Sequence, residues 1–193
     1  IRRTQRLYTQ TFGTLSVEVA NGNEIPKAWW VEFMALHLER WQQRGTAGSF
    51  AKPSTNTFHE RLRSVSAPQP HPTNGLRVHL VRVSAGDETI AYLYNLVFRG
   101  VVCFYQSGFR YHADNKLKPG LLAHALVIQH YCDQGELEYD FLAGETTAAQ
   151  YKRSLAKSSR ALVWEEISAS TRYMRAVHAL RLLRRHWRPT PDV

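Results

Sequence analysis

The chain has 193 residues, of which 44% are hydrophobic and 21% are charged, an ordinary composition for one globular domain with a sizeable core. No apolar run approaches the length needed to span a membrane, and this argues against an integral membrane protein. The formal net charge of +9, from 25 basic and 16 acidic residues, favours an anionic partner without choosing among a phosphate-rich cofactor, RNA and an anionic surface.

The first residue and the cysteines set further bounds. The chain begins at Ile1 without a charged-then-apolar leader, so we expect a piece of a longer protein or a trimmed one. Cys103 and Cys132 are expected to be reduced and mostly buried, which fits a cytoplasmic location. Neither a C-x-x-C pair nor a Cys/His ligand spacing occurs, so no metal site is expected.

The first half of the chain predicts a strand, two helices and a β-hairpin. The strand covers residues 15–19 and is followed by a turn at 21–23, a helix over 24–44, and a helix that Ser54 or Asn56 caps and that runs to about 65. Residues 67–75, with three prolines, form a connector. The hairpin pairs strands 77–84 and 89–98 around a turn at 85–87.

The second half predicts a parallel crossover. A strand over 101–106 is broken by Gln106-Ser107-Gly108, and a helix over 117–134 leads to a second strand over 137–142. A helix over 145–156, a strand over 160–168 and a helix over 171–187 follow. Strands joined by a helix are parallel neighbours, so we expect a mixed α/β sheet with helices on both faces. Ligands bind at the carboxyl ends of such strands.

The C-terminal helix is amphipathic and basic. We expect residues 1–170 to form the domain and residues 171–193 to form this helix and a tail. Its apolar stripe consists of Tyr173, Val177, Leu180, Leu183 and Trp187, and its other face is rich in arginine. The stripe favours packing on the domain or on a missing N-terminal part; binding of RNA or of a membrane surface is the alternative.

Four short segments of the second half carry a family resemblance: Phe104 to Phe109, Lys118 to Leu122, Tyr139 to Glu145, and Tyr151-Lys152. In this order they resemble the GNAT N-acyltransferase superfamily. The resemblance is to its CelD-like acetyltransferase branch, which is related to the Fem-type peptidyltransferases, and it covers residues 24–168. It implies acyl transfer to an amine. The acyl-donor arm would enter a gap between strands 101–106 and 137–142, and Tyr105, Gln106 and Ser107 would line that edge.

The resemblance also implies a phosphate cradle at the start of the helix that follows. Free N–H groups at a helix start suit phosphate, Gly120 and Leu121 would offer them, and Lys116 and Lys118 add positive charge. The alternative is an ordinary helix start with solvated lysines. The superfamily motif Gln/Arg-x-x-Gly-x-Gly/Ala fits no register over 115–122, so acetyl-CoA, another acyl-CoA and aminoacyl-tRNA all stay open as donors.

Four residues are candidates for the chemistry. The resemblance implies that Tyr151 protonates the leaving thiolate, and a phenol suits this step because its pKa is near that of a thiol. Lys152 would neutralise donor phosphate or position the acceptor. Asp140 and Glu145 are candidate bases, although a carboxylate within a strand, such as Asp140, also binds loop N–H groups. The alternative for Tyr151 is packing on the sheet, for Lys152 a solvated position, and for Glu145 a helix-start charge.

The resemblance therefore implies an acyl-CoA-dependent N-acyltransferase, and we expect it to need no metal. The resemblance implies an amine acceptor on an amino sugar or on another precursor of the bacterial cell envelope. Two alternatives remain: a Fem-type peptidyltransferase that uses aminoacyl-tRNA, and a non-catalytic accessory domain for polysaccharide biosynthesis.

Overall fold

A computed structural model describes residues 1–66, 75–142, 150–161 and 163. The chain divides into two compact units, Ile1–Ser158 and Ser159–Val193, and the fold that follows is that of the first unit. The predicted domain boundary after residue 170, the helix over 171–187 and most of the strand over 160–168 lie outside the described residues.

The first unit is built on a five-stranded mixed sheet with the strand order β1-β2-β3-β4-β5. The first four strands are antiparallel neighbours, and β4 and β5 are parallel. This confirms the predicted mixed sheet and its parallel crossover. The strands are β1 (Leu15–Asn21), β2 (Arg77–Ala85), β3 (Glu88–Phe98), β4 (Val101–Phe109) and β5 (Glu138–Asp140).

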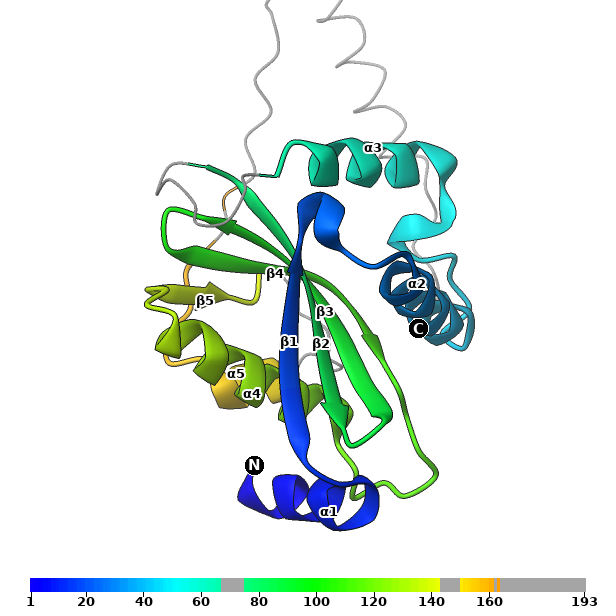
Figure 1. Ribbon diagram of the computed structural model, residues 1–193, viewed down its shortest axis with the longest axis vertical. Helices are drawn as coiled ribbons and strands as arrows, with labels where there is room; N and C mark the ends of the chain where they lie inside the picture. Colours follow the sequence, from blue (N-terminus) through cyan, green and yellow to red (C-terminus); the bar gives the residue numbers. More distant parts are fainter. Residues whose placement is uncertain (67–74, 143–149, 162, 164–193) are drawn as a thin grey trace, which may run out of the picture. The chain divides into compact units, whose positions relative to one another are not determined.

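Helices cover both faces of the sheet. Figure 1 shows α2 and α3 on one face and α4 and α5 on the other, with α1 beside the turn that precedes β1. Short 3-10 helices, η1 and η2, flank α2 in the chain. The helices are α1 (Arg2–Phe12), η1 (Gly22–Glu24), α2 (Lys27–Gln42), η2 (Ser49–Ala51), α3 (Pro53–Ser64), α4 (Pro119–Asp133) and α5 (Gln150–Leu155).

Strand alternation divides the core into two layers. In β2, Val78 and Leu80 pack towards α2 and η2, whereas Val81 and Val83 pack towards α4. Both layers are needed because successive side chains of a strand point to opposite faces, and β2 and β3 are buried on both. The sheet is therefore a double-sided core, and polar groups that serve function are left to its ends and edges.

Two tight turns set the register of the antiparallel strands. Arg99 and Gly100 link β3 to β4, and both have a positive φ, as a type I′ turn requires. Gly86 has a φ of 54° in the turn between β2 and β3. A side chain there would collide with the backbone oxygen of Phe12, so the close approach also requires glycine.

The structure corrects three sequence predictions. Strand β4 does not break at Gln106-Ser107-Gly108 but continues to Phe109. The reason is that Gly108 lies under α2, where a Cβ would come within 2.9 Å of the Leu36 Cβ and of the Phe33 backbone oxygen. Glycine here serves helix-on-strand packing and not a turn.

The second correction concerns the start of α3. This helix begins at Pro53 after Lys52, without a side-chain cap, so neither Ser54 nor Asn56 is its N-cap. Proline suits the first helical position because its missing N–H has no partner there. The third correction is that Cys132 is exposed near the end of α4, although Cys103 is half-buried. Both are free thiols.

Helix α1 was not predicted. Its buried side, Thr4 and Tyr8, continues to the partly buried Phe12, so these side chains recur every four residues, and Gly13 follows the helix. That spacing is a helical signal. It is weak here because polar and basic residues surround it.

Candidate active site

The carboxyl end of β4 is an open strand edge in the described part of the chain. The parallel pairing with β5 runs from Val101 opposite Glu138 to Cys103 opposite Asp140. Strand β5 ends there, whereas β4 continues to Phe109. The two strands therefore part at the position that the crossover predicts for a ligand.

Backbone geometry identifies the groups that face this edge. The Arg110 N–H donates to the Ile90 carbonyl over 2.9 Å, so the backbone of Arg110 faces β3. In an antiparallel pair, residues alternate between facing the partner and facing away. Ser107 and Phe109 lie an odd number of positions from Arg110, and their N–H and C=O groups therefore point away from β3.

A β-bulge separates this edge from the paired part of β4. Asn95 lies opposite Phe104, and the next residue back, Tyr94, lies opposite Gln106, so Tyr105 is an extra residue in β4. A bulge of this kind places two successive side chains on one face. The contacts agree: the Tyr105 ring lies 5.1 Å from that of His59 and 6.4 Å from that of Phe50.

The predicted edge residues therefore have different surroundings. The side chains of Tyr105 and Gln106 lie on the face covered by α2 and α3, where the Gln106 amide donates to the Ser49 hydroxyl over 3.0 Å. Ser107 is half-buried and presents its backbone to the open edge. The structure places Ser107 at the gap and turns the other two side chains away from it.

Lys152 lies where β4 and β5 part. Its ammonium donates to the Phe141 carbonyl over 3.2 Å and sits 4.9 Å from the centre of the Phe104 ring. Burial lowers the pKa of Lys152, and nearby Asp140 partly offsets this effect. Helix α5 thus holds a half-buried cation beside the strand ends.

Asp140 is the last residue of β5. Its carboxylate accepts a hydrogen bond of 2.7 Å from the N–H of Leu142, which has a φ of 54°. This is the loop N–H contact that the sequence allowed for a carboxylate within a strand. Burial and Asp140 together raise the pKa of the neighbouring Cys103 thiol.

A buried histidine of α4 contacts both strands near the point where β4 and β5 part. His124 of α4 is fully buried, and its Nδ1 lies 3.1 Å from the Tyr139 hydroxyl. Its ring packs edge-on against Phe104, with 4.5 Å between centres. Burial, with a smaller effect of Lys152, lowers the pKa of His124 to about 3, so the ring is neutral at physiological pH.

The start of α4 lies beside the end of β4. A Cβ on Gly120 would be 3.5 Å from the Phe109 ring, which shows how closely the two elements approach. Lys118 is the N-cap and makes no side-chain capping bond, and Lys116 and Lys118 are both exposed. Leu121 is half-buried. The first N–H groups of this helix are thus next to the open edge.

Two predicted catalytic side chains cannot be placed. Glu145 lies outside the described residues. Tyr151 belongs to α5 by its backbone, but its side chain is also outside the described part of the structure. Their roles stay predictions.

Sequence reasoning did not single out His37, a buried residue of α2. The His37 Nδ1 lies 3.0 Å from the Ser107 carbonyl, so this ring reaches the open edge of β4. Gly108 makes the contact possible because it lets α2 approach the strand closely. A histidine within an otherwise apolar helix face was the available signal.

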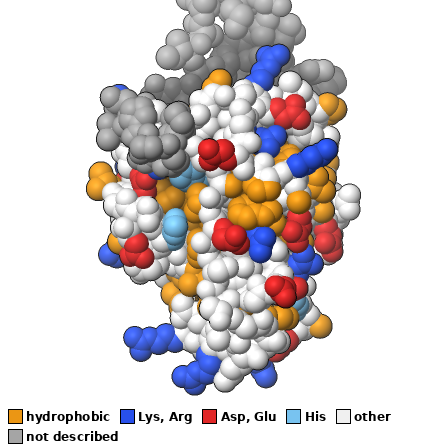
Figure 2. Space-filling model, in the orientation of Figure 1, with side chains coloured by type: hydrophobic (Ala, Val, Ile, Leu, Met, Phe, Trp, Pro, Cys, Tyr) orange, Lys and Arg blue, Asp and Glu red, His pale blue; other side chains and the backbone are white. Residues whose placement is uncertain are grey.

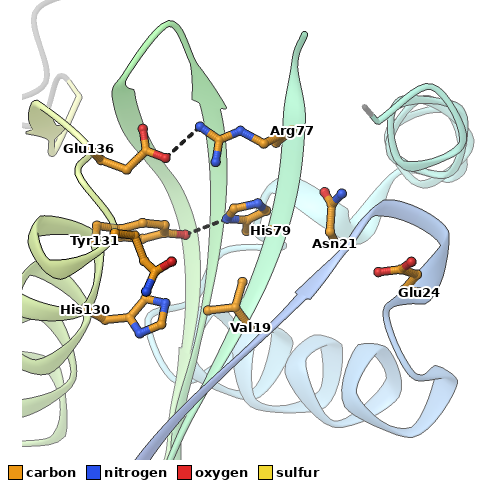
Figure 3. A pocket seen from close by; sticks show the side chains of 9 residues that line it. Val19, Asn21, Glu24, Arg77, His79, His130, Tyr131 and Glu136 are labelled. Atoms are coloured by element: carbon orange, nitrogen blue, oxygen red, sulfur yellow. Dashed lines mark hydrogen bonds and ion pairs between the residues drawn. The ribbon is translucent and has the colours of Figure 1, made fainter. Parts of the chain in front are cut away.

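A second polar region lies at the opposite end of the sheet. A cavity of about 270 Å³ lies between the end of α4 and the strands β1 and β2, and Figure 3 shows side chains that line it. Arg77 and Glu136 form a buried ion pair of 2.7 Å there. The Tyr131 hydroxyl lies 3.0 Å from the Nδ1 of His79 and accepts a bond of 3.2 Å from the Asn95 amide.

On the face in Figure 2, acidic and basic side chains are scattered among hydrophobic and other ones, and neither sign forms a large field. Basic side chains gather at the end formed by α1, where Arg2, Arg3 and Arg6 are exposed. None of the described helices is long and apolar enough to cross a membrane. Within the described residues, no three His, Cys, Asp or Glu side chains cluster as metal ligands would.

Comparison with known proteins places this geometry in a family. The chain matches the acetyltransferase (GNAT) domain over residues 1–153, which include the whole sheet and α1 to α4. No curated protein matches it. The mixed sheet and the parallel β4–β5 pair agree with that fold. The chain therefore belongs to the GNAT acetyltransferase domain family, in its CelD-like and Fem-related branch, and is an acyltransferase.

Proposed function

We propose that this protein transfers an acyl group from acyl-CoA, with acetyl-CoA as the donor, to an amine on an amino sugar or on another cell-envelope precursor in the cytoplasm. The observation that carries the proposal is the open edge of β4. Ser107 turns its backbone N–H, and Phe109 its N–H and C=O, away from β3 and past the point where β5 stops, while the Ser107 carbonyl lies 3.0 Å from the His37 Nδ1. An extended chain with amide groups can bind there as an added strand does.

The arm of CoA fits this edge because it is extended and carries two amides. Its pyrophosphate would lie on the N–H groups of Gly120 and Leu121, which start a helix that has no side-chain cap. Lys116 and Lys118 are exposed just before that helix and add two positive charges. Edge and helix start lie side by side, so one donor molecule can contact both.

The proposed chemistry uses the groups around the strand ends. The acceptor nitrogen attacks the thioester carbonyl carbon, a C–N bond forms, and the C–S bond breaks. Lys152, a half-buried ammonium between the strands, would stabilise the negative charge that develops on the carbonyl oxygen. Tyr151 would give its proton to the leaving thiolate. The bond from Leu142 to Asp140 supports a structural role for that carboxylate.

The test separates the two halves of the donor. Calorimetry compares CoA with pantetheine, which has the amide arm but no pyrophosphate. Lys118→Glu should weaken CoA binding about tenfold or more and reduce its salt dependence, and it should leave pantetheine binding unchanged. Lys27→Glu, an exposed lysine at the start of α2, is the matched control and should change neither.

The outcomes also decide between donors. Binding of both CoA and pantetheine supports the proposal. Binding of aminoacyl-tRNA without CoA binding, with a steep dependence on salt, would identify a peptidyltransferase and overturn the acyl-CoA assignment. Equal weakening by Lys27→Glu and Lys118→Glu would show that only general charge matters.

A further inference from the structure

His37 is a buried imidazole held on the open edge of β4. The residue is 1% exposed, and its Nδ1 lies 3.0 Å from the backbone oxygen of Ser107. A carbonyl oxygen can only accept a hydrogen bond, so Nδ1 carries the hydrogen. The other ring nitrogen, Nε2, then has a lone pair, and within the described part of the chain it has no hydrogen-bond partner.

We propose that Nε2 of His37 takes the proton that the acceptor amine loses during acyl transfer. This inference rests on the proposed N-acyl transfer and assigns its base. A buried acceptor atom without a partner costs free energy, and such atoms in native structures call for an explanation. Here the atom belongs to a ring whose other nitrogen, Nδ1, is anchored on the strand edge where the acyl group is expected.

A neighbouring histidine shows why position matters. His59 is also 1% exposed, and its Nε2 also has no hydrogen-bond partner within the described residues. Its Nδ1 bonds to the Tyr94 hydroxyl, 3.3 Å away, within the layer between β3 and α3. His59 therefore contacts a side chain inside the core, whereas His37 contacts the backbone of the open edge.

The proton balance is complete. The neutral imidazole takes one proton from the amine nitrogen as the C–N bond forms, and the thiolate that leaves as the C–S bond breaks takes one from Tyr151. The imidazolium and the phenolate then return to their starting forms by proton exchange with water after the products leave. No oxidant, metal or further reactant is required.

The surroundings of His37 keep it ready as a base. Rings of Phe33 and Trp41 on α2 and of Phe50 on η2 pack around it, at 5.1 to 6.0 Å between centres, and none of them titrates. Burial lowers the pKa of His37, and the bond to Ser107 offsets this only in part. The ring is therefore neutral at neutral pH, and the acceptor has to reach Nε2 as it binds.

The experiment uses His37→Asn, because an asparagine amide can replace the Nδ1–H bond to Ser107 but cannot act as a base. Release of CoA from acetyl-CoA is followed with glucosamine and a panel of small primary amines as acceptors, from pH 5.5 to 9.5. We expect kcat/KM at pH 7 to fall about a hundredfold or more. The loss should persist as pH rises towards the pKa of the acceptor amine, because a free amine still gives up one proton as the C–N bond forms.

Two variants provide the comparison. His59→Asn removes a histidine of equal burial and should leave the pH profile of the wild type unchanged. Glu145→Gln tests the carboxylate that the sequence favoured. A shift of the profile in Glu145→Gln, with none in His37→Asn, overturns the proposal.

A second measurement does not depend on an acceptor or on a folded variant. Nitrogen NMR of the histidine rings in the wild-type protein at pH 7.5 should show His37 with a proton on Nδ1 and none on Nε2. A proton on Nε2 overturns the proposal. If the protein binds acetyl-CoA but no amine accelerates CoA release, the proposed N-acyl transfer fails, and with it any base role.

Discussion

The two ends of the sheet differ in whether their polar groups have partners within the described chain. At the end where β4 begins, Arg77 pairs with Glu136 and Tyr131 bonds to His79 (Figure 3). The Tyr131 hydroxyl also accepts a bond from Asn95. At the end where β4 finishes, the strand edge has no neighbouring strand among the described residues, and α4 starts without a cap. One end is closed by its own side chains and the other leaves backbone groups for a ligand.

This difference shows how the fold separates stability from function. Buried charges and hydroxyls are tolerated where partners within the chain satisfy them. Backbone groups left open cost stability unless water or a ligand binds them. Variants at the closed end should therefore affect mainly folding, and variants at the open end mainly binding and turnover.

The largest effect is expected from Arg77→Ala. It leaves the carboxylate of Glu136 buried without its partner, and the loss of one member of such a pair costs about 3–5 kcal/mol of unfolding free energy. Urea denaturation measures it. Arg82→Ala, which removes a more exposed ion pair with Glu18 from the same strand, should cost about 1 kcal/mol or less. Equal losses of unfolding free energy in the two variants would contradict a special role for the buried Arg77–Glu136 pair.

At the open end, Tyr151→Phe should lower kcat about tenfold to a thousandfold and leave CoA affinity and stability nearly unchanged. The reason is the loss of one proton donor to the leaving thiolate. Steady-state kinetics and calorimetry check it, with Tyr111→Phe, an exposed tyrosine, as the control. If Tyr151→Phe keeps full turnover, Tyr151 is not the proton donor and serves only in packing.

Much of this architecture could be predicted from the sequence. The alternation in residues 77–98 and the helical run before Leu137 produce the hairpin and the parallel crossover, because local periodicity fixes both. The end of β4 could not be read correctly. Ser107-Gly108 looks like a break in the strand, but the strand continues because α2 packs on it. The contact residues His37 and Ser107 are seventy residues apart in the chain, so local sequence cannot reveal this packing.

The candidate site was predictable only in part. Lys152 and Asp140 come together near the strand ends as the motif order indicates. His37 was missed because its contact is to a backbone carbonyl, and a backbone carbonyl leaves no mark in the sequence. The bulge at Tyr105, which turns two neighbouring side chains to one face, has no sequence signal either.

Gly108→Ala should cost about 1–3 kcal/mol, because a Cβ there lies 2.9 Å from the Phe33 backbone oxygen and α2 must shift. The same shift should lengthen the contact between His37 and Ser107 and lower turnover. Gly120→Ala, which meets only ordinary contacts at 3.5 Å, is the control for stability. Thermal denaturation compares the two variants. If Gly108→Ala is as stable as the wild type, α2 can move away from β4 at little cost.

The smallest effect concerns pH. The pKa of His124 is about 3 in the folded protein and about 6.5 when unfolded, so between these values the unfolded chain holds one more proton. Unfolding free energy should therefore fall with decreasing pH below 6.5, by about 1.4 kcal/mol per unit from this residue. His124→Asn should reduce the slope between pH 5 and 6.5 by that amount, and an unchanged slope would contradict a neutral buried ring.

The most direct test of the open edge is a titration of the isotope-labelled protein with acetyl-CoA, followed through its backbone amide signals. Ser107, Phe109, Gly120 and Leu121 should shift most, because the donor arm and pyrophosphate would contact their N–H groups. Arg77, Tyr131 and their neighbours at the closed end should not move. Shifts that gather around the cavity of Figure 3 while the β4 edge stays unchanged would contradict the account.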